Sequence, residues 1–102
     1  MKRVVGLGAC VVDTLISCDQ LPKEDTKYKA NSVTKIPGGP VCNALVVMSR
    51  LGTSAEVIGS FADDDGGAFI LSDLQKCGIE TKNVYIAPNT ESFTSYVILS
   101  ES

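Results

Sequence analysis

The stretch PGGPVCNALVVMSRLG, residues 37–52, places a pair of glycines directly before an amphipathic pattern. Pro40 suits the first position of a helix, where its missing N–H would lack a partner in any case. Five apolar residues then follow the spacing of one helical face, and Gly52 stands where a glycine ends a helix. The pattern predicts a helix over 40–51 that is entered through a tight glycine turn.

Apolar segments alternate with this helix along the chain. RVVGLGACVV and SAEVIGSF are short, β-branched and apolar, which predicts buried parallel strands over 3–9 and 55–61. DDDGGAFILSDLQKCG predicts a second helix that stops at Gly78. The more polar segments 14–18 and 27–36 predict two strands that leave the main sheet as a flap. This alternation predicts an α/β fold with a mainly parallel sheet.

The last two segments, NVYIAP and SFTSYVILS, also read as strands. Nothing after the second one could cover it, and a parallel sheet needs helices on both of its faces. Only two helices are predicted, so we expect residues 1–102 to form the front part of a larger domain. The sequence contains no internal repeat.

Charge and hydropathy exclude several classes of partner. The net charge of −3 is spread along the chain without a basic stripe, which argues against nucleic acid. Asp13 interrupts the apolar run near the N-terminus, so that run is not a signal peptide. No segment approaches the roughly 20 apolar residues that span a bilayer, and we expect no membrane partner.

The four cysteines show no C-x-x-C spacing and no regular framework. We therefore expect small buried thiols in a reducing cytosol rather than disulfides or zinc ligands, which predicts a cytoplasmic protein. The absence of histidine excludes Ser-His and Cys-His nucleophile pairs and the usual zinc sites from this sequence.

Two other motifs invite a functional interpretation and do not support it. GLGACV begins like a dinucleotide fingerprint, but Val11 replaces the third glycine and no helix follows directly. A Walker-type phosphate loop is also missing from the sequence. The consecutive acids at 63–65 lack the spacing of calcium ligands and suit the start of the second helix, so no metal site is expected.

The glycine turn is a candidate binding site. Gly38 and Gly39 allow a backbone to approach a ligand closely, and Asn43, one turn into the helix, offers both a donor and an acceptor. The loop carries no Lys or Arg, which argues against a phosphate. Asp13 follows the first strand, at the edge where α/β sheets bind ligands. From these residues alone, a plain strand-to-helix turn and a capping aspartate remain alternatives.

The segment GGPVCNALVVMSRLG resembles the N-terminal signature of the PfkB-type, ribokinase-like carbohydrate kinases, with two glycines, a spacer, an asparagine, a helix and Leu-Gly. GLGACVVD, LPKEDTKY and VIGSFADDDGGAFILSDLQKCGI follow the family order, so the resemblance covers essentially the whole chain. Within the family the chain is most similar to fructokinases and ketohexokinases. It departs from the pattern at Val11, Pro40 and Ala62, positions that bear on substrate choice.

The resemblance implies a ribokinase-like fold and transfer of the ATP γ-phosphate to a sugar hydroxyl. It implies that Asp13 hydrogen-bonds sugar hydroxyls, that Gly38 and Gly39 form a hinge close to the sugar, and that Asn43 contacts a sugar hydroxyl. The strands at 14–18 and 27–36 would form a β-lid that closes over the sugar, excludes water and often supplies a homodimer contact.

The family's catalytic base and its contacts to ATP and Mg²⁺ lie in the C-terminal half. The resemblance therefore implies no catalytic, cofactor-binding or metal-binding residue within 1–102, and a chain that is inactive alone. Two alternatives to a sugar kinase are kept: a truncated, non-catalytic module for sugar binding or dimerisation, and a nucleoside kinase of the same superfamily.

Overall fold

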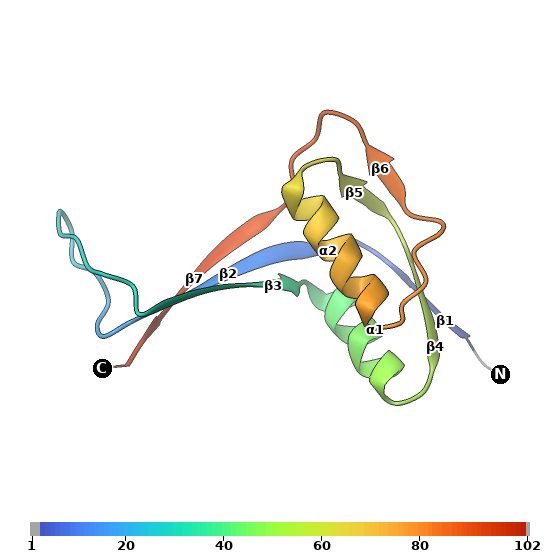
Figure 1. Ribbon diagram of the computed structural model, residues 1–102, viewed down its shortest axis with the longest axis horizontal. Helices are drawn as coiled ribbons and strands as arrows, with labels where there is room; N and C mark the ends of the chain where they lie inside the picture. Colours follow the sequence, from blue (N-terminus) through green and yellow to red (C-terminus); the bar gives the residue numbers. More distant parts are fainter. Residues whose placement is uncertain (1–2, 102) are drawn as a thin grey trace.

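The computed structural model describes residues 3–101 as an α/β arrangement (Figure 1). The predicted order of strands and helices is confirmed, except that two strands replace the single one expected between the helices. Its elements are β1 (Arg3–Leu7), β2 (Val11–Cys18), β3 (Ser32–Gly38), α1 (Pro40–Arg50), β4 (Ser54–Ile58), β5 (Ser60–Ala62), α2 (Asp65–Lys76), β6 (Tyr85–Ala87) and β7 (Thr94–Ser100).

Both helices end at the predicted glycines, Gly52 and Gly78. The amide of each glycine donates to a carbonyl three residues earlier, and the next amide donates to a carbonyl five residues earlier. All four hydrogen bonds are 3.0 Å long. This pattern satisfies carbonyls that a helix end otherwise leaves unpaired, so each glycine determines where its helix stops.

The helices pack with short parallel strands into a body that we call the base, made of β1, β4, β5, β6, α1 and α2. β1 and β4 pair in parallel, in register from Arg3↔Ser54 to Leu7↔Ile58. The buried apolar side chains form one cluster, and the most enclosed of them come from α1, β4 and α2. Its members are Cys10, Val12, Cys42, Leu45, Ala55, Val57, Phe61, Ile70, Leu74 and Ile79.

One charged side chain is buried in the base. Glu56 on β4 is 1% exposed, and its carboxylate lies 3.4 Å from the guanidinium of Arg3. The side-chain amide of Asn83 donates a 2.7 Å hydrogen bond to the other carboxylate oxygen. A buried carboxylate needs such partners to offset the loss of water, so these residues tie β1 and the segment before β6 to β4.

Two strands of the base differ in extent from their predicted ranges. The first ends at Leu7 rather than at residue 9, and the strand expected over 55–61 is divided into β4 and β5. The division falls at Gly59, where a Cβ atom would lie 2.8 Å from the carbonyl oxygen of Gly8. β5 therefore pairs with β6 rather than continuing the ladder of β4 with β1.

A second sheet has the order β3-β2-β7, and we call it the lid sheet. β2 pairs antiparallel with β3, from Val11↔Gly38 to Ser17↔Ser32, and parallel with β7, from Val12 to Cys18. The predicted flap of two strands was wrong in extent. The sheet contains a third strand, β7, and the two predicted strands cover 11–18 and 32–38 rather than 14–18 and 27–36. The partner of β7 lies about 80 residues earlier, so local sequence could not indicate it.

The lid sheet gives the molecule an elongated shape. The radius of gyration is 16.0 Å, whereas a compact chain of this length has about 13 Å. In Figure 1 the lid sheet and the connection between β2 and β3 extend to one side of the two helices. Val12 at the root of β2 belongs to the buried cluster of the base and anchors this end of the lid sheet, whereas Cys18 at the far end of β2 is buried outside that cluster. Neither helix within residues 3–101 is long and apolar enough to cross a membrane.

Candidate functional site

Three of the four predicted site residues meet where the lid sheet joins the base. Asp13 is the third residue of β2, and Gly38 is the last residue of β3. Val11 pairs with Gly38 across the sheet, and Asp13, two residues further along β2, points to the same face of the sheet. The carboxylate of Asp13 therefore lies against the backbone of Gly38. A Cβ atom at position 38 would overlap one carboxylate oxygen, Oδ2, so any side chain larger than that of glycine would displace this carboxylate.

Gly39 forms the turn from the lid sheet into α1. Its φ is 97°, a conformation that residues with a side chain rarely adopt, and it is the N-cap of the helix. A Cβ atom there would lie 3.1 Å from the carbonyl oxygen of Ala9. Pro40 occupies the first turn, as predicted, and no side chain caps this end of the helix.

Asn43 joins this group through its backbone. Its amide donates a 3.1 Å hydrogen bond to the carbonyl of Gly39, which closes the first turn of α1. Its side chain is exposed. The structure therefore brings Asp13, Gly38 and Gly39 together and presents Asn43 one turn along the adjoining helix.

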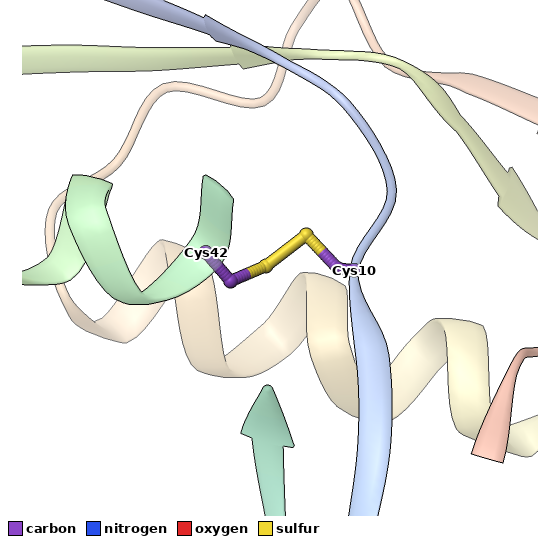
Figure 2. Close-up of a disulfide and its surroundings, with 2 residues drawn as sticks. All are labelled: Cys10 and Cys42. Carbon is purple, nitrogen blue, oxygen red and sulfur yellow. A yellow bond between two sulfur atoms is a disulfide. The ribbon is translucent and has the colours of Figure 1, made fainter. Parts of the chain in front are cut away.

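A disulfide lies at the same junction and was not predicted (Figure 2). Cys10 and Cys42 are bonded, with their Cα atoms 5.8 Å apart. The expectation of four free thiols was wrong for these two cysteines and is confirmed for Cys18 and Cys77. The two halves are 32 residues apart, and they meet only because the β1–β2 connection passes the first turn of α1. Disulfides persist mainly in oxidising compartments, so the cysteines no longer support a cytoplasmic location.

Ser95 is a neighbour of the candidate site that the sequence did not indicate. It lies on β7 opposite Asp13, and its hydroxyl donates a 2.6 Å hydrogen bond to Oδ1 of the Asp13 carboxylate. The available signal was weak. Ser95 is one of the polar residues of β7, together with Thr94 and Ser100, and only the register with β2 places it opposite Asp13.

The acidic segment 63–65 has a structural role. Asp64 caps α2 by accepting a 2.8 Å hydrogen bond from the amide of Gly67, as predicted for a helix start. It also accepts from the hydroxyl and the amide of Ser92, at 2.6 and 2.7 Å. The Ser92 hydrogen bonds, together with that of Gly67, lower the pKa of Asp64 to about 2.

Asp63 binds a neighbouring loop rather than the helix. It accepts hydrogen bonds from the amides of Asn89 and Thr90, at 2.8 and 3.2 Å, which lower its pKa. Among residues 3–101, no group of three or more acidic or cysteine side chains is arranged to hold a metal ion.

A cavity of about 290 Å³ lies on the base side of the junction, lined by residues of the β1–β2 connection and the β6–β7 loop. Phe61, Ile70, Ser92 and Phe93 contribute to its wall. None of the four predicted site residues lines it. Asp13 and Gly39 are half-buried and Asn43 is exposed, so solvent reaches the predicted site.

Comparison with known proteins assigns the chain to a family. The whole chain, residues 1–102, matches the family described as pfkB family carbohydrate kinase. It is 31% identical over 101 residues to the ribokinase of Bacillus subtilis, covering 99% of this chain and 34% of that protein.

Solved structures agree with this match. The chain superposes on a protein from Agrobacterium tumefaciens assigned as a ribokinase with a TM-score of 0.87 and 34% identity, over 97% of this chain and 32% of that one. It superposes on the aminoimidazole riboside kinase of Salmonella enterica, solved with aminoimidazole riboside and an ATP analogue, with a TM-score of 0.74 and 28% identity. That match covers 94% of this chain and 29% of the other.

The chain belongs to the PfkB family of carbohydrate kinases and has the ribokinase-like fold. It spans about one third of the length of the relatives it matches.

Proposed function

We propose that residues 1–102 are the N-terminal, sugar-binding portion of a kinase that transfers phosphate from ATP to a sugar hydroxyl. The observation that carries the proposal is the junction itself. Asp13 and the glycine pair are 25 residues apart in sequence, yet the carboxylate lies directly on Gly38. That packing places a half-buried carboxylate close to the half-buried turn at Gly39, and hydrogen-bond acceptors and backbone groups of this kind suit a neutral polyhydroxyl ligand.

Each predicted residue has a role in this proposal. Asp13 accepts hydrogen bonds from sugar hydroxyls, and the backbone of Gly38 and Gly39 approaches the sugar at the hinge. Asn43, with its exposed amide on the first turn of α1, donates to or accepts from a further hydroxyl.

The lid sheet would close over the bound sugar. It is attached to the base at one end, and its connection to α1 passes through Gly39, whose positive φ only glycine adopts readily. Closure would keep water from the reacting phosphate, so that transfer goes to the sugar. Its exposed apolar side chains, including Val33, Tyr96 and Ile98, also support a homodimer formed through this sheet.

ATP and Mg²⁺ would be held by a part of the protein beyond these residues, together with the catalytic general base. An apolar groove of about 240 Å³ runs along β1 and α1, lined by Val4, Val41, Ala44, Leu45 and Met48. Within residues 3–101, β1 pairs with β4 alone. A free strand edge beside an apolar groove supports the packing of a further part of the protein against β1 and α1. Because that further part would carry the catalytic base, residues 1–102 alone would be inactive.

The experiment uses the longer protein that carries this chain. ATP-dependent phosphorylation is measured with ribose, fructose and other free sugars, and with ribosides. Asp13→Ala and Asn43→Ala are then compared with the wild type by calorimetric titration of the accepted sugar and of an ATP analogue. We expect about a 10-fold weaker sugar affinity for each variant and an unchanged affinity for the nucleotide. Glu24→Ala, an exposed acid of the β2–β3 connection, is the control.

Three outcomes separate the possibilities. Sugar binding without phosphate transfer favours the non-catalytic module, and phosphorylation of ribosides alone favours a nucleoside kinase. Unchanged sugar affinity in both site variants refutes the assignment of Asp13 and Asn43.

A further inference from the structure

We propose that Ser95 is a positioning residue for the sugar-binding carboxylate of Asp13. This inference rests on the proposed function and adds a residue from a different strand to the site. Ser95 contributes through the carboxylate that it orients, and no direct contact with the sugar is required of it.

The geometry of the pair is that of a strong hydrogen bond. Asp13 and Ser95 are directly opposite each other on the parallel strands β2 and β7, so their side chains share one face of the lid sheet. The hydroxyl-to-carboxylate distance of 2.6 Å lies in the range of charge-assisted hydrogen bonds, which are about twice as strong as neutral ones.

The carboxylate is held from two sides. Ser95 binds Oδ1 from β7, and the backbone of Gly38 lies against Oδ2 from β3. Rotation of the carboxylate would break the first contact and move an oxygen out of the space that glycine leaves. The pair therefore fixes Oδ2 on the side of β3, toward the turn that leads to Gly39 and α1.

The neighbours of the pair on this face offer the carboxylate no other side-chain donor. Register places Leu15, Ile36 and Val97 next to the pair, and none of these apolar side chains can donate a hydrogen bond. Without the Ser95 hydroxyl, the carboxylate would therefore lose the side-chain donor that holds it in one orientation.

The test measures the longer protein with its accepted sugar and ATP. In Ser95→Ala, we expect the KM for the sugar to rise about 10-fold while the KM for ATP stays within about 2-fold of the wild type. Ser95→Thr keeps the hydroxyl in a strand that tolerates β-branched residues, so we expect it to restore the sugar KM to within about 3-fold. Ser95→Cys keeps nearly the same volume with a weak donor, and we expect it to resemble Ala.

Thr94→Val is the matched control. Thr94 precedes Ser95 on the same strand, is exposed and points to the opposite face of the sheet, so removing its hydroxyl should change neither KM. Because Cys nearly matches Ser in volume, an effect shared by Ala and Cys and reversed by Thr reports the hydroxyl rather than a folding defect.

The outcomes distinguish this inference from the function on which it rests. If the wild-type protein phosphorylates a sugar and Ser95→Ala and Ser95→Cys leave the sugar KM unchanged, the positioning role is refuted and the kinase function stands. The same holds if Thr fails to restore the sugar KM, or if both KM values rise together. If the wild-type protein neither binds nor phosphorylates a sugar, both proposals are refuted.

Discussion

The base and the lid sheet are stabilised in different ways. The base buries its side chains between two helices and short strands, and Val57 and Leu74 are entirely enclosed. The lid sheet has longer strands and longer ladders, but Tyr96, Ile98 and Leu99 on β7 are 45 to 71% exposed. Burial of apolar surface therefore stabilises the base, whereas backbone hydrogen bonds and register hold the lid sheet together.

The candidate site residues lie at the boundary between these two regions, where the enclosed base meets the more exposed lid sheet. Gly38 and Gly39 connect a strand of the lid sheet to a helix of the base, and Asp13 is on the lid side of that connection. The disulfide fastens the base side, because Cys10 and Cys42 both belong to the buried cluster.

The largest contrast should appear when one apolar side chain is truncated in each region. Leu74→Ala in α2 should lower the free energy of unfolding by about 2–5 kcal/mol, since it leaves a cavity in a filled core. Ile98→Ala in β7 should cost about 1 kcal/mol or less, because nearly half of its surface is already in water. Urea denaturation of both variants measures the difference.

A similar loss in the two variants would contradict this contrast. It would mean that the exposed face of the lid sheet is covered in solution, as a homodimer through that sheet would require. Repeating the Ile98→Ala measurement at several protein concentrations separates these cases, because only a dimer makes stability depend on concentration.

Removal of the disulfide should have the next largest effect. The bridge closes a loop with a sequence separation of 32, for which chain entropy gives a stabilisation of about 3–4 kcal/mol. Replacing Cys10 and Cys42 together by alanine should lower the free energy of unfolding by about that amount. Cys77→Ala is the control, because that thiol is free and only half-buried.

Thiol counting tests the bridge directly. Alkylation of the unfolded, unreduced protein should modify Cys18 and Cys77 only, and two further sites should react after reduction. Four modified cysteines without reduction would show that the bridge is absent and restore the original expectation of free thiols.

A substitution at the junction should change the affinity for the sugar more than it changes the free energy of unfolding. Gly38→Ala would place a methyl group where Oδ2 of Asp13 lies, so the carboxylate must move. We expect a loss of sugar affinity of about 10-fold or more, since a displaced acceptor leaves its hydroxyl partner unpaired. Calorimetry with the accepted sugar measures it. Gly52→Ala is the control, because no atom lies within 4 Å of the position that its Cβ would take, although its positive φ strains any side chain.

An unchanged sugar affinity in Gly38→Ala would place the sugar away from Asp13. Equal losses in Gly38→Ala and Gly52→Ala would instead indicate general backbone strain rather than displacement of the carboxylate.

Local sequence patterns predicted most of the helices and strands, because a helix face, a helix stop or a buried strand depends on residues within one short segment. The helix at 40–51, its stop at Gly52 and the acidic cap of the second helix all follow from neighbouring residues. The third strand of the lid sheet, the Cys10–Cys42 bridge and the Asp13–Ser95 hydrogen bond do not. Each depends on a register or a chain crossing between residues 32 to 82 apart, which local spacing cannot encode.

The smallest predicted effect concerns pH, and it tests how the loop before β7 is tied to the base. Asp64 has its pKa lowered from 3.8 to about 2 by hydrogen bonds from Ser92 and Gly67. The folded protein thus holds the charged form more tightly than the unfolded chain does. This contribution to stability is complete above pH 3.8 and is lost as the pH falls toward 2.

In Asp64→Asn the carboxylate is replaced by an amide that can still cap the helix. The decline of the urea midpoint between about pH 4 and 2 should therefore be shallower in this variant than in the wild type. It should not vanish, because the pKa of Asp63 is also lowered by the amides of Asn89 and Thr90. Identical slopes for variant and wild type would mean that Asp64 does not bind Ser92 in solution. The loop that leads into β7 would then be held to the base by Asp63 rather than by the helix cap.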